Sequence, residues 1–103
     1  MATTEEFILF VCGQIQGDYD IRYRKMFGEY MVYANDKPIL LVCDNRVFVK
    51  QLPQVAELMK DAVRGVPYAG AKEHYVLDTA DKKLTSEVVV LLERITPLPK
   101  KRK

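Results

Sequence analysis

The chain has 103 residues and a net charge of +2, and 49% of its residues are apolar. This length fits one domain rather than two, and the apolar fraction is enough for a single core. Four basic residues end the chain, Lys100, Lys101, Arg102 and Lys103, and without them 12 basic residues stand against 14 acidic ones. The body is therefore mildly acidic, which argues against a basic nucleic-acid-binding face spread over the domain.

The N-terminus and the cysteines point to the cytoplasm. The chain opens with the acidic pair Glu5 and Glu6, where a secretory signal would be basic. Its longest apolar run, residues 39 to 43, is far too short to span a membrane. Cys12 and Cys43 are expected to be buried, reduced thiols, because a disulfide would need an oxidising compartment. We expect a cytoplasmic protein without membrane contact.

Residues 4 to 16 are expected to form a helix, since apolar residues recur at helical spacing and Thr3 with Glu6 fits a capping box. Four strands should follow, at residues 21–26, 29–34, 38–43 and 46–50. Asn35-Asp36 and Asp44-Asn45 mark the turns, because both residue types tolerate a left-handed backbone. Short connections of this kind predict an antiparallel meander.

The second half of the chain is expected to add two helices and one strand. Pro53 suits the first turn of a helix that ends at Gly65, and residues 74–77 should form a strand. Residues 88–90 are all valine and could favour a strand, but the helical period around them extends over twelve residues. The apolar stripe of this final helix is Leu84, Val88, Leu91, Leu92 and Ile95.

The predicted fold is α+β, with about five antiparallel strands and three helices in the order α-β-β-β-β-α-β-α. Residues 1–96 would form the domain. Residues 97–103 would form a disordered basic tail, because Pro97 and Pro99 stop the last helix.

No group of residues nominates a catalytic or metal site. His74 is the single histidine, and no further metal ligands cluster around it in the sequence. The glycine-containing segment at residues 65–72 enters a strand, so it lacks the helix N-terminus that binds phosphate. Thr85 and Ser86 have no local general base. We therefore predict no enzymatic activity, no catalytic residue, no metal and no cofactor, and keep a small enzyme only as a third alternative.

Two features could contact nucleic acid. The run at residues 97–103 looks like a nuclear localisation signal and could hold phosphates loosely, although a solvated end is the favoured interpretation. Phe27, Tyr30 and Tyr33 stand near the basic residues Arg24 and Lys25 and could stack on bases. The commoner alternative for such aromatics is the core face of a strand.

Several short motifs occur in a fixed order along the chain. They are Arg24-x-Met26-Phe27-Gly28-x-Tyr30, Asp36-Lys37, Asp44-x-Arg46-x-Phe48-x-Lys50, Pro67-Tyr68-x-Gly70-Ala71-Lys72 and Tyr75. As a set they resemble the N-terminal domain of the TfoX/Sxy proteins, regulators of bacterial DNA transformation competence. The match runs from about Val11 to Leu92. Asn35-Asp36-Lys37 departs from the usual Asp-Gly-Lys turn, and Leu77-Asp78 stands where family members tend to carry Pro-Glu.

The resemblance implies an α+β fold in which helices pack on an antiparallel sheet, similar to the type III secretion-chaperone architecture, where many members pair as dimers. It supplies no established catalytic residue and no cofactor. Full-length competence regulators carry a second, C-terminal helical domain, and this chain ends where that domain would begin. We therefore expect a stand-alone domain of the N-terminal type.

The expected function is that of a non-enzymatic regulatory or adaptor domain acting through protein–protein contacts. Its partner is an unidentified protein, and a homodimer is a further candidate. The expected interaction surface combines charge with contact area: Arg24, Phe27, Gly28, Lys50, Tyr68 and Lys72. Gly28 could instead be a bulge, and Tyr68 could only pin its loop against the second helix. The alternative function is weak nucleic-acid association through Lys100, Lys101, Arg102 and Lys103.

Overall fold

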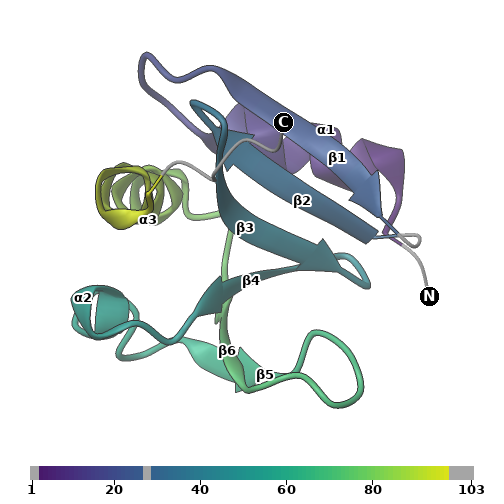
Figure 1. Ribbon diagram of the computed structural model, residues 1–103, viewed down its shortest axis with the longest axis vertical. Helices are drawn as coiled ribbons and strands as arrows, with labels where there is room; N and C mark the ends of the chain where they lie inside the picture. Colours follow the sequence, from purple (N-terminus) through teal and green to yellow (C-terminus); the bar gives the residue numbers. More distant parts are fainter. Residues whose placement is uncertain (1–2, 27–28, 98–103) are drawn as a thin grey trace, which may run out of the picture.

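The structure is a computed structural model that describes residues 3–26 and 29–97. One six-stranded antiparallel sheet has the strand order β1-β2-β3-β4-β6-β5. The elements in chain order are α1 (Glu5–Gln14), β1 (Ile21–Met26), β2 (Glu29–Ala34), β3 (Lys37–Cys43), β4 (Arg46–Lys50), α2 (Pro53–Ala56), β5 (Val63–Gly65), β6 (His74–Leu77) and α3 (Lys82–Ile95). Figure 1 shows α1 behind β1 and β2, with α2 and α3 along the left side of the sheet.

The first helix is shorter than predicted, and Thr4 caps it instead of Thr3. The Oγ1 atom of Thr4 accepts a hydrogen bond from the backbone N–H of Phe7 at 3.2 Å. Thr3 is buried and donates its hydroxyl to the carboxylate of Glu29 at 2.9 Å. Because Thr3 is held by β2, the next residue is left to cap the helix. The helix ends at Gln14 rather than at residue 16.

The meander of four strands is confirmed, with β3 beginning at Lys37, one residue before the predicted start. Both predicted turns use the left-handed backbone that their residue types tolerate. Asn35 and Asp36 have φ values of 51° and 68°, and Asp44 and Asn45 have values of 52° and 55°. Two positive φ angles in a two-residue loop suit the right-handed twist of the flanking strands.

The predicted helix from Pro53 to Gly65 is wrong beyond its first turn. Only Pro53–Ala56 is helical, and Val63–Gly65 forms β5 against β6. Val55 and Met59 are buried in the core, as their apolar spacing indicated. The segment after Ala56 that carries this spacing forms turns instead of a continuous helix. The free edge of β6 offers backbone partners to residues 63–65, and Val63 and Gly65 favour a helix weakly. The sheet therefore has six strands instead of the predicted five.

The last helix is confirmed, and its valine run is helical. Val88, Val89 and Leu92 are buried, and the side chain of Asp81 caps the start by accepting from the N–H of Leu84. At the other end Lys37 Nζ donates to the backbone carbonyl of Glu93 at 2.8 Å and lies 3.2 Å from its carboxylate. The contact of Lys37 with the carboxylate lowers the pKa of Glu93, and the two contacts together tie α3 to β3.

The core lies between the helices and one face of the sheet. Residues on that face alternate along each strand, as the burial of Val32 and Ala34 in β2 and of Val47 and Val49 in β4 shows. From the helices, Ile8, Val11, Val88, Val89 and Leu92 complete this core. In the described part of the chain, the opposite face of the sheet is covered by no helix, and we call it the open face (Figure 1).

Both cysteines are free thiols, as expected. Burial, followed by the nearby carboxylates of Glu29 and Asp44, raises the pKa of Cys43 to about 11. Its thiol therefore stays protonated at neutral pH and is no nucleophile. Over residues 3–26 and 29–97, no helix has the length and apolar character needed to cross a membrane.

The Asp44-Asn45 turn is hydrogen-bonded to Thr3 and Thr4, just before α1. Asn45 Oδ1 accepts from the N–H of Thr4 at 3.0 Å, and the N–H of Asn45 donates to Thr3 Oγ1 at 3.2 Å. Asn45→Ala should cost about 1–2 kcal/mol of unfolding free energy, since it loses the acceptor and strains a left-handed residue. Asn45→Gly loses the same acceptor but relaxes the backbone, so its change should stay within about 0.5 kcal/mol. Urea unfolding of both variants measures the difference, and equal losses would contradict the assigned backbone strain.

Candidate functional site

One lateral row of side chains crosses the open face through all six strands. The register pairs Arg24 with Met31, Met31 with Leu41, and onward to β4, β6 and β5. Directly paired residues of antiparallel strands point to the same face, so the row is continuous. Its members are Arg24, Met31, Leu41, Phe48, Val76 and Val63. The row is cationic at the β1 edge and apolar across the centre and the β5 edge.

Phe48 is the centre of this face, and polar side chains cover its ring. The Arg46 guanidinium carbon lies 5.6 Å from the Phe48 ring centroid. The ring of His74 meets Phe48 edge-on, with centroids 6.3 Å apart and an interplanar angle of 89°. Phe48 is only 1% exposed. It therefore packs the open face and offers no ring surface on which a base could stack.

The structure places Lys50 and Lys72 of the predicted surface close together. Lys50 pairs with His74 in the register of β4 and β6. His74 Nδ1 lies 2.7 Å from the backbone carbonyl of Lys72, and because a carbonyl oxygen only accepts, Nδ1 carries the proton. Both lysines are exposed. The β6 end of the open face therefore carries two cations beside one histidine.

Arg24 and Tyr68 lie away from this pair. Arg24 is exposed on β1, three strand steps from Phe48, which is roughly 14 Å at ordinary strand spacing. Tyr68 is 62% exposed in the loop between β5 and β6, so it does not pin that loop against α2. Phe27 and Gly28 lie outside the described residues. Of the predicted surface, Arg24 and Lys50 share the open face, Lys72 lies next to its β6 end, and Tyr68 is in the exposed loop between β5 and β6.

The predicted aromatic stacking group is wrong for Tyr30 and Tyr33. Tyr30 is 6% exposed and lies on the helix-covered face, where its ring meets Tyr23 at 5.5 Å between centroids. Tyr33 belongs to the open face, because neighbours in a strand alternate and Val32 and Ala34 are buried on the other side. Two tyrosines on opposite faces cannot present one stacking platform. The alternative, a place in the core face of a strand, is confirmed for Tyr30.

Sequence reasoning missed Met31, Leu41, Arg46 and His74 as parts of this face. Met31 and Leu41 alternate with the buried residues of β2 and β3, and this period could have identified them. His74 is a half-buried strand residue, as expected for a lone histidine. Its place beside Phe48 and Lys50 depends on the pairing of β4 with β6, which no short-range pattern reveals.

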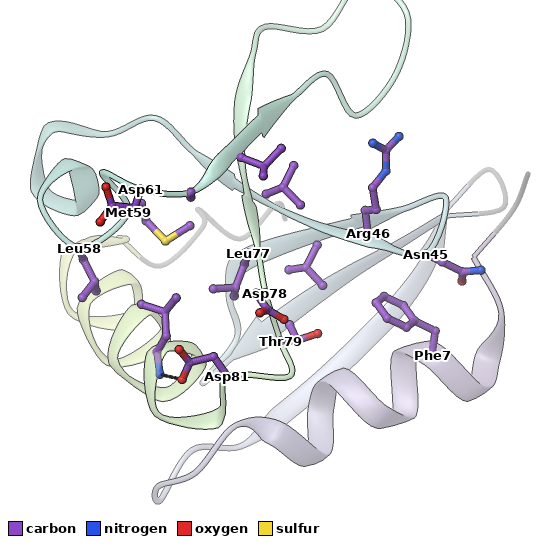
Figure 2. Close-up of a pocket in the computed structure, with 15 residues that line it drawn as sticks. Phe7, Asn45, Arg46, Leu58, Met59, Asp61, Leu77, Asp78, Thr79 and Asp81 are labelled. Carbon is purple, nitrogen blue, oxygen red and sulfur yellow. Dashed lines mark hydrogen bonds between the residues drawn. The ribbon is translucent and has the colours of Figure 1, made fainter.

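A cavity of about 740 Å³ lies on the helix side between α1, α3 and β6 (Figure 2). The cavity is lined by three aspartates, Asp61, Asp78 and Asp81, but two of their carboxylates already accept hydrogen bonds from backbone N–H groups. Asp78 accepts from the N–H of Ala80 and Asp81 from the N–H of Leu84, each at 3.1 Å. Figure 2 shows Asp61 apart from the other two aspartates and Arg46 pointing away from them. The carboxylates of Asp78 and Asp81 therefore stabilise a turn and cap a helix, which are structural roles.

Within residues 3–26 and 29–97, no group of three or more His, Cys, Asp or Glu side chains is placed to hold a metal ion. The predicted nucleic-acid contacts, Lys100, Lys101, Arg102 and Lys103, lie outside the described residues. The division into a domain at residues 1–96 and a tail at 97–103 stays a prediction.

The chain is similar to a curated relative of unknown activity, the uncharacterized 12.7 kDa protein in the trpE 5′ region of Spirochaeta aurantia. The two are 31% identical over 105 residues, which cover 100% of this chain and 91% of the relative. The chain belongs to the family of that protein. No family model matches the chain, and no solved structure matches it.

Proposed function

We propose that this protein is a non-enzymatic regulatory or adaptor domain that binds another protein through the open face of its sheet. The observation that supports this is the row from Arg24 to Val76, where half-buried Met31 and Leu41 follow the exposed cation Arg24. Protein interfaces combine an apolar centre with a polar or charged rim. Lys50 and Lys72 would supply that rim at the β6 end.

The kind of regulation that we propose rests on the resemblance to the TfoX/Sxy N-terminal domain. We propose a relationship to regulators of DNA transformation competence, a secretion-chaperone-like arrangement of helices on the sheet, and a location in the cytoplasm. The motif positions that carry the resemblance include Arg24, Phe48 and Lys50, which all belong to the open face. These positions support a surface shared with the TfoX/Sxy N-terminal domains, rather than a shared reaction.

Charge reversal on the open face tests this proposal. The double variant Arg24→Glu, Lys50→Glu should keep the melting temperature within about 3 °C, because both side chains are exposed. Recovery of a protein partner captured from host extract, measured by quantitative mass spectrometry, should fall at least about ten-fold. Lys60→Glu with Lys83→Glu makes the same charge change away from the open face and should retain the partner. Equal recovery by both double variants would remove the open face from consideration.

The second candidate function is weak nucleic-acid association through the basic C-terminus. The support for it is the block of four cations at residues 100–103, on a chain whose remainder is mildly acidic. Flexible cations bind phosphates by releasing counterions, so such binding depends steeply on salt.

Deletion of residues 100–103 separates this candidate from the first. Binding of a fluorescent single-stranded DNA should show a slope of about −3 in log affinity against log salt, since four contacts each contribute about −0.7. The deletion should abolish the binding while the captured protein partner is kept. DNA binding that survives both the deletion and high salt would refute the tail as its source.

A homodimer is a further proposal, and the outer side of α1 supports it. Leu9 and Phe10 are 54% and 47% exposed, although α1 already buries Ile8 and Val11 against the sheet. The free edge of β1 suits self-association less well. Antiparallel pairing of two β1 strands about a two-fold axis at Tyr23 would set Arg22 opposite a like charge, Arg24 of the second copy.

Sedimentation velocity over a range of concentrations measures the oligomeric state. The wild type should form a dimer, and Leu9→Glu with Phe10→Glu should give a monomer that stays folded, although its melting temperature should fall because the stabilisation by association is lost. Tyr23→Glu, at the β1 edge, is the matched control and should remain dimeric. A monomeric wild type at high concentration, or a dimer that persists in the α1 variant, would contradict this interface.

A further inference from the structure

The strands β3 and β4 separate halfway along their length. Only Leu41, Val42 and Cys43 of β3 pair with β4, through Phe48, Val47 and Arg46. Beyond Leu41 the remaining half of β3 pairs with β2 alone, while the end of β4 pairs with β6. A cavity of about 590 Å³ opens at this separation, and we call it the β3–β4 groove. Its volume lies within the range of about 300–1,000 Å³ that is usual for small-molecule sites.

The walls of the groove are mostly apolar and come from distant parts of the chain. Met31 and Leu41 contribute from the open face, Leu52 from the segment after β4, and Ile95 from the end of α3. All four are only partly buried, so apolar surface stays accessible inside the groove. An alkyl chain placed there would remove this surface from water without needing hydrogen-bond partners.

Among the described lining residues, the groove has a single charged side chain, and it is a cation. Lys50 lines it together with His74, and no Asp or Glu is among its described lining residues. Lys50 is exposed and has no ion-pair partner within the described part of the chain. His74 is held in place by its hydrogen bond to the carbonyl of Lys72 and by its edge-on contact with Phe48. The groove therefore offers a cation to an anionic head group beside an apolar channel.

We propose that the β3–β4 groove binds a small amphiphilic carboxylate, with its alkyl chain against Met31, Leu41 and Ile95 and its carboxylate at Lys50. The described lining is mostly apolar and free of acids, and its lysine has no ion-pair partner within the described residues. A neutral lipid would leave this lysine unpaired, and the lysine would repel a cationic amphiphile, so an anionic amphiphile is favoured. This site goes beyond the proposed protein contact and requires no partner protein.

Decanoate, kept below its critical micelle concentration, is the probe. Titration into the isotopically labelled full chain should produce saturable NMR shifts of the Met31, Leu41, Leu52 and Ile95 methyl groups, with the Leu9 methyl groups unmoved. Lys50→Met keeps the length and apolar character of the side chain and should weaken decanoate binding by about five-fold, which corresponds to one exposed charge pair. Lys72→Met removes the same charge just outside the groove and should leave the affinity unchanged.

Two further comparisons decide the outcome. 1-Decanol should bind the wild type about five-fold more weakly than decanoate and should be insensitive to Lys50→Met, because it has no charge to pair. Leu41→Asp places a carboxylate in the channel and should abolish binding; its thermal melt confirms that it folds, and Met31→Asp replaces it if it does not. Shifts without saturation, shifts spread over the whole surface, or equal affinities for decanoate in the wild type and Lys50→Met would overturn the proposal.

Discussion

The antiparallel pairing of β4 with β6 holds the two halves of this protein together. It joins the N-terminal meander to the segment that carries β5 and α3, and it sets Phe48 opposite Val76 and Lys50 opposite His74. A slip of one residue would turn both pairs toward the helices and would bury a lysine in the core. The open face, the cover over Phe48 and one wall of the β3–β4 groove all depend on this register.

Helices on a single face of the sheet determine where charge can lie. The covered face accepts only side chains that tolerate burial, as Val32, Val47 and Val49 illustrate. Although the body of the chain has more acidic than basic residues, four of the seven cations in the described strands lie on the open face: Arg22, Arg24, Arg46 and Lys50. The mildly acidic body of the chain thus presents a locally cationic surface, and net charge alone does not reveal it.

Lys50 links the two proposals made for the open face. It belongs to the surface proposed to bind a protein and to the groove proposed to bind a carboxylate. A carboxylate paired with Lys50 would remove one cation from the protein-binding surface, so the two ligands would weaken each other by the same factor. The larger cavity on the helix side has no comparable role, since Asp78 and Asp81 are engaged with backbone N–H groups.

The sequence by itself determined the features that depend on short-range physics. The turns at Asn35 and Asn45, the four strands of the meander and the helical period of α3 were predicted because left-handed tolerance and periodicity are local properties. Tertiary structure alone decided that residues 63–65 form a strand, because the edge of β6 supplies their partners. It also decided that His74 stands beside Lys50 and that β3 leaves β4 beyond Leu41. These contacts join residues far apart in the chain, where pairing and packing, rather than local preference, set the lowest free energy.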